Sequence, residues 1–230
     1  MLEAGSWKLE LNLEIKPPTS HLSLLDGTSG TWRLIMRILI ISDKEEPFVW
    51  DHFNPEFFKN INMTISCGDV KPEYLSFLAT MLKAPLYYVH GNHDGQYLQS
   101  PPEGCMSIDG KFIRHGGMRI MGIGGSNRYN RGPHQYTEAQ MRIRLFKLKP
   151  SIWRNGGIDI FVSHAPAFGL NDGDDLCHKG FKTFKSILDA YKPRFFIHGH
   201  QHLCYGSRQR LTDYGSTTII NAYGYYILEF

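Results

Sequence analysis

Short apolar runs alternate with mixed polar segments along most of the chain, and this pattern predicts strands alternating with helices. Residues 36–42, 61–66 and 86–89 are largely apolar and of strand length. Residues 71–83 have apolar side chains at helical spacing. The side chains concerned are Tyr74, Leu75, Leu78, Met81 and Leu82. The order strand, helix, strand indicates parallel strands joined by a crossover helix.

The second half of the chain predicts two further helices and a set of short strands. Thr137 and Gln140 have the spacing of a capping box ahead of a periodic apolar stretch, which marks the start of one helix. Apolar residues from Phe181 to Tyr191 mark the other. Four short segments read as strands: 194–197, 208–212, 217–221 and 225–230. We therefore expect mixed sheets with helices outside them.

The first 35 residues differ from the rest of the chain. Apolar and polar residues alternate from Trp7 to Ile15, as in a half-buried strand. Two prolines at 17–18 and the glycine-containing segment 27–30 then interrupt the chain. We predict an N-terminal extension over residues 1–35, followed by one domain over residues 36–230. Two alternatives stay open for the extension: an upstream translated segment, or an extra edge strand.

Candidate metal ligands follow several of the predicted strands. Asp43 and Glu45 come just past the first strand, and residues two apart in an extended chain point the same way. Both carboxylates can therefore face one ion. Asp69 follows a glycine and can bridge two cations through its two oxygens. The remaining candidates are the amide oxygen of Asn92 and the imidazoles of His164, His200 and His202, and imidazoles suit Mn, Fe, Zn or Ni more than Ca or Mg.

Five blocks of such residues occur in a fixed order. They are Asp43-Lys44-Glu45, Gly68-Asp69, Gly91-Asn92-His93-Asp94, His164 and Gly199-His200-Gln201-His202. This order resembles the calcineurin-like metallophosphoesterase superfamily, whose blocks are Asp-x-His, Gly-Asp, Gly-Asn-His-Asp/Glu, a lone His, and Gly-His-x-His. The resemblance implies an α/β fold, a four-layer αββα sandwich in which helices flank two mixed sheets. It places the site at the carboxyl ends of the strands.

The resemblance also implies a role for each residue of the site. One divalent ion would be held by Asp43, Glu45, Asp69 and His202. The second would be held by Asp69, Asn92, His164 and His200. His93 would be the acid for the leaving group, oriented by Asp94. The implied activity is that of a dinuclear metal-dependent hydrolase, in which a water or hydroxide bridging the ions attacks a phosphomonoester or phosphodiester.

Glu45 departs from the family pattern, which has histidine at this position. Asp43, Glu45 and Asp69 supply three negative charges, whereas a histidine would leave two. The extra anionic oxygen favours a harder ion such as Mn, with Fe, Zn or Ni as alternatives, and weakens the acidification of a bridging water. The other possibility is that Glu45 points to solvent and the first ion binds weakly.

Three loop residues are candidate contacts to substrate. Arg128, which follows Asn127 after a glycine-rich turn, could clamp a phosphate bidentately, unless both are ordinary surface residues. The turn at 122–125 lacks the spacing and the following helix of a dinucleotide-binding loop. His178 resembles a substrate-side histidine of some branches of the family. Its alternative is a loop residue at the entry to the third helix.

Composition narrows the class of protein. With 230 residues, 42% of them hydrophobic, the chain can bury a sizeable core, and a formal net charge of +3 decides little. The densest basic group lies on the second predicted helix and reads as solvated surface: Arg142, Arg144, Lys147 and Lys149. No basic stripe indicates nucleic acid, although it is not excluded as a partner.

Compartment and partners follow from weaker signals. The four cysteines, Cys67, Cys105, Cys177 and Cys204, have no C-x-x-C spacing, which favours a reduced, cytoplasmic setting. No run has transmembrane length, so we expect no membrane partner. The expected partner is a small phosphoester substrate. Two alternatives remain: a non-catalytic interaction protein on the same fold, and a nuclease of the same superfamily.

Overall fold

The computed structural model describes residues 35–203 and 209–230. The chain divides into two units, residues 1–34 and 35–230, and the description below concerns the second. The strand expected between Trp7 and Ile15 lies outside the described residues, as does Cys204. The extension over residues 1–35 and its role therefore stay predictions.

The first sheet has five strands in the order β13-β1-β2-β3-β4. Their bounds are β1 Arg37–Ser42, β2 Met63–Ser66, β3 Leu86–Tyr88, β4 Cys105–Ser107 and β13 Gly224–Glu229. Strands β1 to β4 are parallel, with Ile38 opposite Met63, and β13 is an antiparallel edge. The parallel strands β1 and β2 are almost entirely buried, which explains their continuous apolar sequence.

The second sheet has six strands in the order β11-β12-β10-β9-β6-β5. Their bounds are β5 Lys111–His115, β6 Met118–Ile123, β9 Ile160–Ser163, β10 Phe195–His198, β11 Leu211–Tyr214 and β12 Thr217–Asn221. The four inner strands are parallel, and β5 and β11 form antiparallel edges. A separate parallel pair joins β7 Ser126–Asn127 to β8 Gln135–Tyr136.

The three helices lie where the sequence predicts them. Helix α1 is Pro72–Leu82, α2 is Glu138–Arg154, and α3 is Lys182–Tyr191. The capping box that opens α2 is confirmed, because Thr137 accepts from the Gln140 backbone and Gln140 accepts from the Thr137 backbone. A short 3-10 turn, η1 Asp94–Leu98, follows β3.

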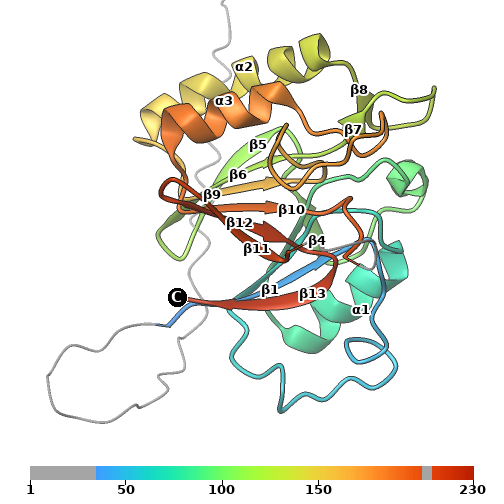
Figure 1. Ribbon diagram of the computed structural model, residues 1–230. Coiled ribbons are helices and arrows are strands. Elements are labelled where there is room, and N and C mark those ends of the chain that lie inside the picture. The colour runs from blue at the N-terminus through green and yellow to red at the C-terminus, as the bar shows by residue number, and fades with distance from the viewer. Residues whose placement is uncertain (1–34, 204–208) are drawn as a thin grey trace, which may run out of the picture. The chain divides into compact units, whose positions relative to one another are not determined.

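The elements stack in four layers, which confirms the predicted αββα sandwich (Figure 1). One buried cluster, which includes Ile40, Ile65, Val162 and Ile197, fills the space between the two sheets. A second cluster joins the second sheet to α2 and α3, and a third joins the first sheet to α1. The carboxyl ends of the parallel strands of both sheets carry the loops that contain the predicted ligands, because each ligand follows β1, β2, β3, β9 or β10.

Candidate metal centre

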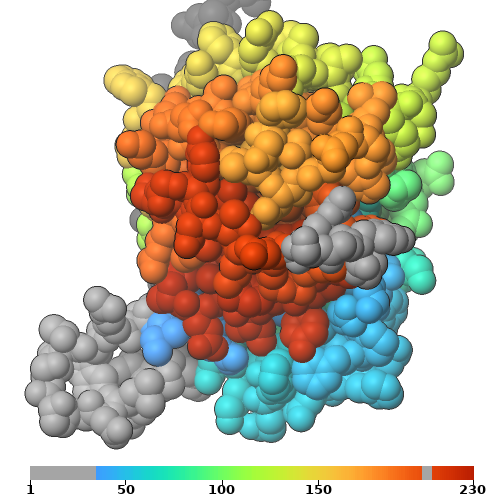
Figure 2. All heavy atoms as spheres, viewed as in Figure 1, coloured from blue at the N-terminus to red at the C-terminus, as the bar shows by residue number. Residues whose placement is uncertain are grey.

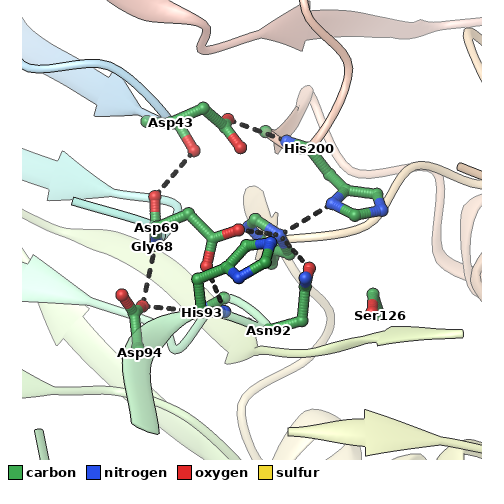
Figure 3. Close-up of polar contacts among 12 residues, drawn as sticks. Asp43, Gly68, Asp69, Asn92, His93, Asp94, Ser126 and His200 are labelled. Carbon is green, nitrogen blue, oxygen red and sulfur yellow. Dashed lines mark hydrogen bonds and ion pairs between the residues drawn. The ribbon is translucent and has the colours of Figure 1, made fainter. Parts of the chain in front are cut away.

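Four predicted ligands from two sheets converge at the strand ends. One side-chain ligand atom each from Asp43, Asp69, His164 and His200 lies within 4.8 Å of all the others. The two aspartates follow β1 and β2 of the first sheet, and the histidines follow β9 and β10 of the second. In Figure 3 the side chains of Asp43, Asp69 and His200 face a common space. We refer to these four residues as the metal-ligand group.

Three members of the metal-ligand group hold an unusual backbone conformation. The φ angles of Asp43, Asp69 and His200 are 62°, 55° and 66°. Left-handed conformations of residues other than glycine cost about 1 to 3 kcal/mol each and gather at functional sites. The turn at each strand end therefore aims its side chain at the centre at the expense of local stability.

Two glycines let the loops after β2 and β3 meet. A Cβ atom on Gly68 would lie 2.2 Å from the backbone nitrogen of Gly91, and one on Gly91 would lie 2.0 Å from Asp69 Oδ1. No larger residue fits at either position without moving the loops. The close approach allows the backbone N–H of His93 to donate to Asp69 Oδ1 at 2.7 Å.

The two imidazoles of the group each turn one ring nitrogen toward the other. His164 Nδ1 lies 2.8 Å from the Cys67 carbonyl oxygen, and His200 Nε2 lies 2.8 Å from the Cys177 carbonyl oxygen. Carbonyl oxygens only accept, so these two nitrogens carry the protons. The opposite nitrogens, His164 Nε2 and His200 Nδ1, lie 3.0 Å apart. Two lone pairs at this distance require a proton or a cation between them, and such an arrangement fits a metal ion.

Asn92 completes the arrangement and is held by a residue that the sequence did not single out. Its Oδ1 lies 3.0 Å from His164 Nε2, and its Nδ2 donates to the Tyr129 hydroxyl at 3.1 Å. The hydroxyl therefore holds the amide of Asn92 in place beside the centre. The only sequence signal for Tyr129 is its place directly after Asn127 and Arg128.

The charged side chains of the metal-ligand group shift one another's pKa values. Burial alone would lower the pKa of His164, but Asp69 and then Asp43 outweigh it and raise the pKa to about 9. Burial and the positive charge of His164 lower the pKa of His200 to about 3. Burial opposes the charge of Asp69, yet His164 holds the pKa of that carboxyl at about 2. The proton on His164 thus occupies the electrostatic position that a cation would take.

His93 and Asp94 stand at the edge of the group. The His93 side chain is exposed, and its positive form would lower the pKa of Asp69. Asp94 Oδ2 accepts from the backbone N–H of Gly91 at 2.7 Å and of Asp69 at 3.0 Å. Burial and the charge of Asp69 raise the pKa of Asp94 to about 6. Asp94 therefore orients the two loops. The sequence predicts that Asp94 orients the His93 imidazole, and within the described residues no hydrogen bond joins these two side chains.

Glu45 and His202 lie outside the metal-ligand group. Glu45 Oε1 accepts from the backbone N–H of Lys71 at 2.8 Å, at the start of α1. The ring of His202 packs on the ring of Tyr223, with 4.8 Å between centroids. The structure therefore brings together Asp43, Asp69, Asn92, His164 and His200, and the ligand roles of Glu45 and His202 stay predictions.

The three predicted substrate contacts lie in different places relative to the metal-ligand group. His178 lies beside the centre, with its ring 5.1 Å from the ring of His200 and its Nδ1 bonded to Asp175 at 2.9 Å. Asn127 Nδ2 donates to the carbonyl oxygen of Lys179 at 2.6 Å and so fixes the loop that carries His178. Arg128 is exposed and donates to Gln140 on α2, so its side chain is engaged away from the centre.

A second histidine pair supports the loop after β3. His90 Nδ1 lies 3.2 Å from Asp109 Oδ2, and the His90 and His134 rings stack with 4.5 Å between centroids and 9° between planes. Ring lone pairs lie in the ring plane, so two stacked parallel rings cannot direct them to one ion. Asp109 Oδ1 also accepts from Arg144 at 2.5 Å. The expectation that the basic group on α2 is solvated is therefore wrong for Arg144.

Comparison with known proteins identifies the family. The family model of calcineurin-like phosphoesterases matches residues 36–204. The chain belongs to the calcineurin-like phosphoesterase family. Calcineurin-like phosphoesterases are generally metal-dependent hydrolases, and the family also includes non-catalytic members.

The chain is also similar, at low sequence identity, to several solved structures. TT1561 of Thermus thermophilus is 15% identical, with 83% of this chain and 90% of that chain covered and a TM-score of 0.54. GAP50, the anchor in the inner membrane complex of Plasmodium, is 14% identical, with coverages of 82% and 71% and a TM-score of 0.48. Calcineurin-like phosphoesterase YfkN from Bacillus subtilis is 13% identical, with coverages of 85% and 90% and a TM-score of 0.40. No curated protein matches the chain. None of the described helices is long and apolar enough to cross a membrane.

Proposed function

We propose that this member of the family is an active phosphoesterase that hydrolyses a small phosphomonoester or phosphodiester with two divalent ions bound. The supporting observation is the approach of His164 Nε2 to His200 Nδ1, 3.0 Å apart, among the oxygens of Asp69 and Asn92. A fold alone does not establish an activity, whereas a convergent ligand set of this kind has a chemical purpose.

The two proposed ion positions would have unequal numbers of ligands. Asp69, Asn92, His164 and His200 would hold one ion, and Asp43 and Asp69 would share the other. Bound divalent ions supply Lewis acidity toward the phosphoryl oxygens and a nucleophilic water near neutral pH. Imidazole and oxygen ligands together suit Mn, which we propose ahead of Fe, Zn or Ni. Because Glu45 and His202 lie outside the group, we expect the position at Asp43 to fill second and more weakly.

His93 is the proposed proton donor. Its backbone N–H is anchored on Asp69 Oδ1, while its imidazole is exposed beside the centre and is open to a substrate. A histidine in this place can give a proton to the departing oxygen of the ester. His178, on the opposite loop, is the proposed contact to the substrate, with Asp175 fixing its ring.

We also propose a reducing, cytoplasmic setting. Cys67, Cys105 and Cys177 are free thiols among the described residues. Cys67 and Cys177 offer their backbone carbonyls to the two histidines of the centre, so their local conformation matters to it. Free thiols this close to a metal centre are best preserved in a reducing compartment.

The test pairs metal content with turnover. The full chain is purified without chelator, analysed for metals, and assayed with aryl phosphate mono- and diesters in the presence of Mn. We expect turnover, which His164→Ala abolishes together with metal binding. The matched control is His52→Ala, an exposed histidine that lies before β2 and outside the centre.

Each other outcome selects an alternative. Wild-type protein with bound metal and no turnover of any ester indicates the non-catalytic alternative. Cleavage of nucleic acid in preference to the aryl esters, with binding that falls steeply with salt, indicates a nuclease.

A further inference from the structure

The outer helices α2 and α3 enclose an apolar groove that the proposed activity does not use. The groove has a volume of about 640 Å³, and its apolar lining includes Leu145, Phe146, Ile187 and Tyr191. Figure 1 shows α2 and α3 side by side on the outer face of the second sheet, and Figure 2 shows them as neighbouring yellow and orange surfaces. The groove therefore lies on a helical face, apart from the loops of the metal centre.

Helix α2 has one more apolar stripe than the fold requires. It buries Met141, Leu145, Leu148 and Ile152 against the sheet. A second set of large apolar side chains is exposed, with Ile143 at 58%, Phe146 at 67% and Trp153 at 85%. Residues at spacings of three and ten lie on one side of a helix. Ile143 and Phe146 line the groove, and exposed apolar groups beside a groove are typical of a surface that binds a partner.

The edges of the groove are basic. Arg142, Lys149 and Lys182 line it, and within the described residues none of the three forms an ion pair. The acidic lining residue, Glu138, has its carboxylate engaged, because it accepts the backbone N–H groups of Lys182 and Thr183 at the start of α3. The groove thus offers an apolar floor between three cations that form no ion pair among the described residues, although Lys149 and Lys182 lie over the rings of Phe146 and Phe168.

We propose that the α2–α3 groove binds an acidic amphipathic helix of a partner protein. A helix laid between two helices inserts apolar residues at positions i, i+3 and i+7 and places its flanking residues at the groove edges. Acidic flanks would pair with Arg142, Lys149 and Lys182. The stripe from Ile143 to Trp153 is about 15 Å long at 1.5 Å per residue, which matches about three turns of such a helix.

Two other occupants fit the surface less well. A second copy of this chain would bring the same cations to the groove and repel them. An anionic membrane would attract the cations, but a bilayer is too broad to fill a groove between two helices. The charge and the concave shape both favour a narrow acidic ligand.

The probe is a phage-displayed library of random 16-residue peptides, selected on the full chain and measured afterwards by fluorescence anisotropy. We expect selected sequences to have apolar residues at helical spacing flanked by Asp and Glu. Their affinity should fall at least tenfold on Phe146→Glu and on Arg142→Glu. The matched control is Leu98→Glu, which alters a side chain that is 77% exposed on the turn η1 and should leave affinity unchanged. Thermal unfolding of each variant establishes that it is folded.

Four results would overturn the proposal. The first is a library that yields no peptide sensitive to Phe146→Glu, and the second is selection of basic peptides. The third is a homodimer, seen by sedimentation, that Phe146→Glu dissociates. The fourth is sedimentation with phosphatidylserine vesicles that Trp153→Ser abolishes.

Discussion

Individual residues decide how well the sequence predicts this site. Asp43, Asp69, Asn92, His164 and His200 are expected as ligands, and the structure gathers all five. The rule that residues two apart face the same way holds only in an extended chain. Asp43 and His200 have φ angles of 62° and 66°, which interrupt the extended backbone before Glu45 and His202. Their left-handed turns therefore remove the geometric basis for directing both side chains of each pair at one ion.

Tyr129→Phe tests the residue that the sequence could not reveal. The change keeps the ring and removes the hydroxyl that accepts from Asn92 Nδ2. With the amide free to rotate, we expect metal affinity to fall by about tenfold, the lower end of the effect of losing such a support. Isothermal titration with Mn measures it. Tyr226→Phe, in strand β13, is the control, and equal affinities of the two variants would exclude a positioning role for Tyr129.

Glu45→Gln tests whether Glu45 is a metal ligand or only a contact at the start of α1. Glu45 accepts the Lys71 N–H at the start of α1, where a negative charge stabilises a helix by about 0.3 to 1 kcal/mol. We expect a loss of stability on that scale in urea titrations, with metal affinity unchanged. Asp69→Asn should instead remove metal binding. A large loss of metal affinity in Glu45→Gln would return Glu45 to the coordination shell.

His93→Ala tests the proton donor. We expect metal content to be retained, because only the backbone of His93 contacts Asp69 through a hydrogen bond. Turnover of esters with poor leaving groups should fall about a hundredfold or more, the usual scale of general acid catalysis. Nitrophenyl esters need little protonation and should lose much less. An equal loss for both kinds of ester points to a role in positioning.

At the scale of elements, the three helices were predictable, whereas several of the strands were not. The three helices and the capping box of α2 follow from spacing alone. Strands β7 and β8 have two residues each and β4 has three, too few for any alternation to show. A helical pattern also cannot tell which basic residue turns inward. The partner of Arg144 is Asp109, which is 35 residues away in sequence.

Asp109→Asn tests the contact that holds α2 to the loop after β3. Burial disfavours the charge of Asp109, but His90 and Arg144 outweigh it and lower the pKa from 3.8 to about 2. The ionised carboxylate thus stabilises the folded state above about pH 4, and this contribution is lost as the pH falls toward 2. The shift corresponds to roughly 2 kcal/mol. Urea unfolding should show a difference of that size at pH 7 that narrows near pH 2, and a constant difference would contradict the assignment.

At the scale of the whole molecule, we expect the fold to persist without bound metal. Three buried hydrophobic clusters, between the sheets and under the helices, supply the core of the domain. We expect protein treated with EDTA to keep its near-ultraviolet circular dichroism and to unfold cooperatively at a lower temperature. Mn at a hundredfold excess over its Kd should restore about 2.7 kcal/mol of stability. Loss of tertiary structure in EDTA would show that the centre is part of the core.

The division of the ligands between the two sheets has a mechanical consequence. Asp43, Asp69 and Asn92 extend from the first sheet, and His164 and His200 extend from the second. A bound ion would hold one sheet to the other at one edge of the sandwich. The affinity of the centre for the ion would then depend on the spacing between the two sheets. Ile65→Ala or Val162→Ala, which removes side-chain volume from the core between the sheets, would then lower metal affinity without changing a ligand.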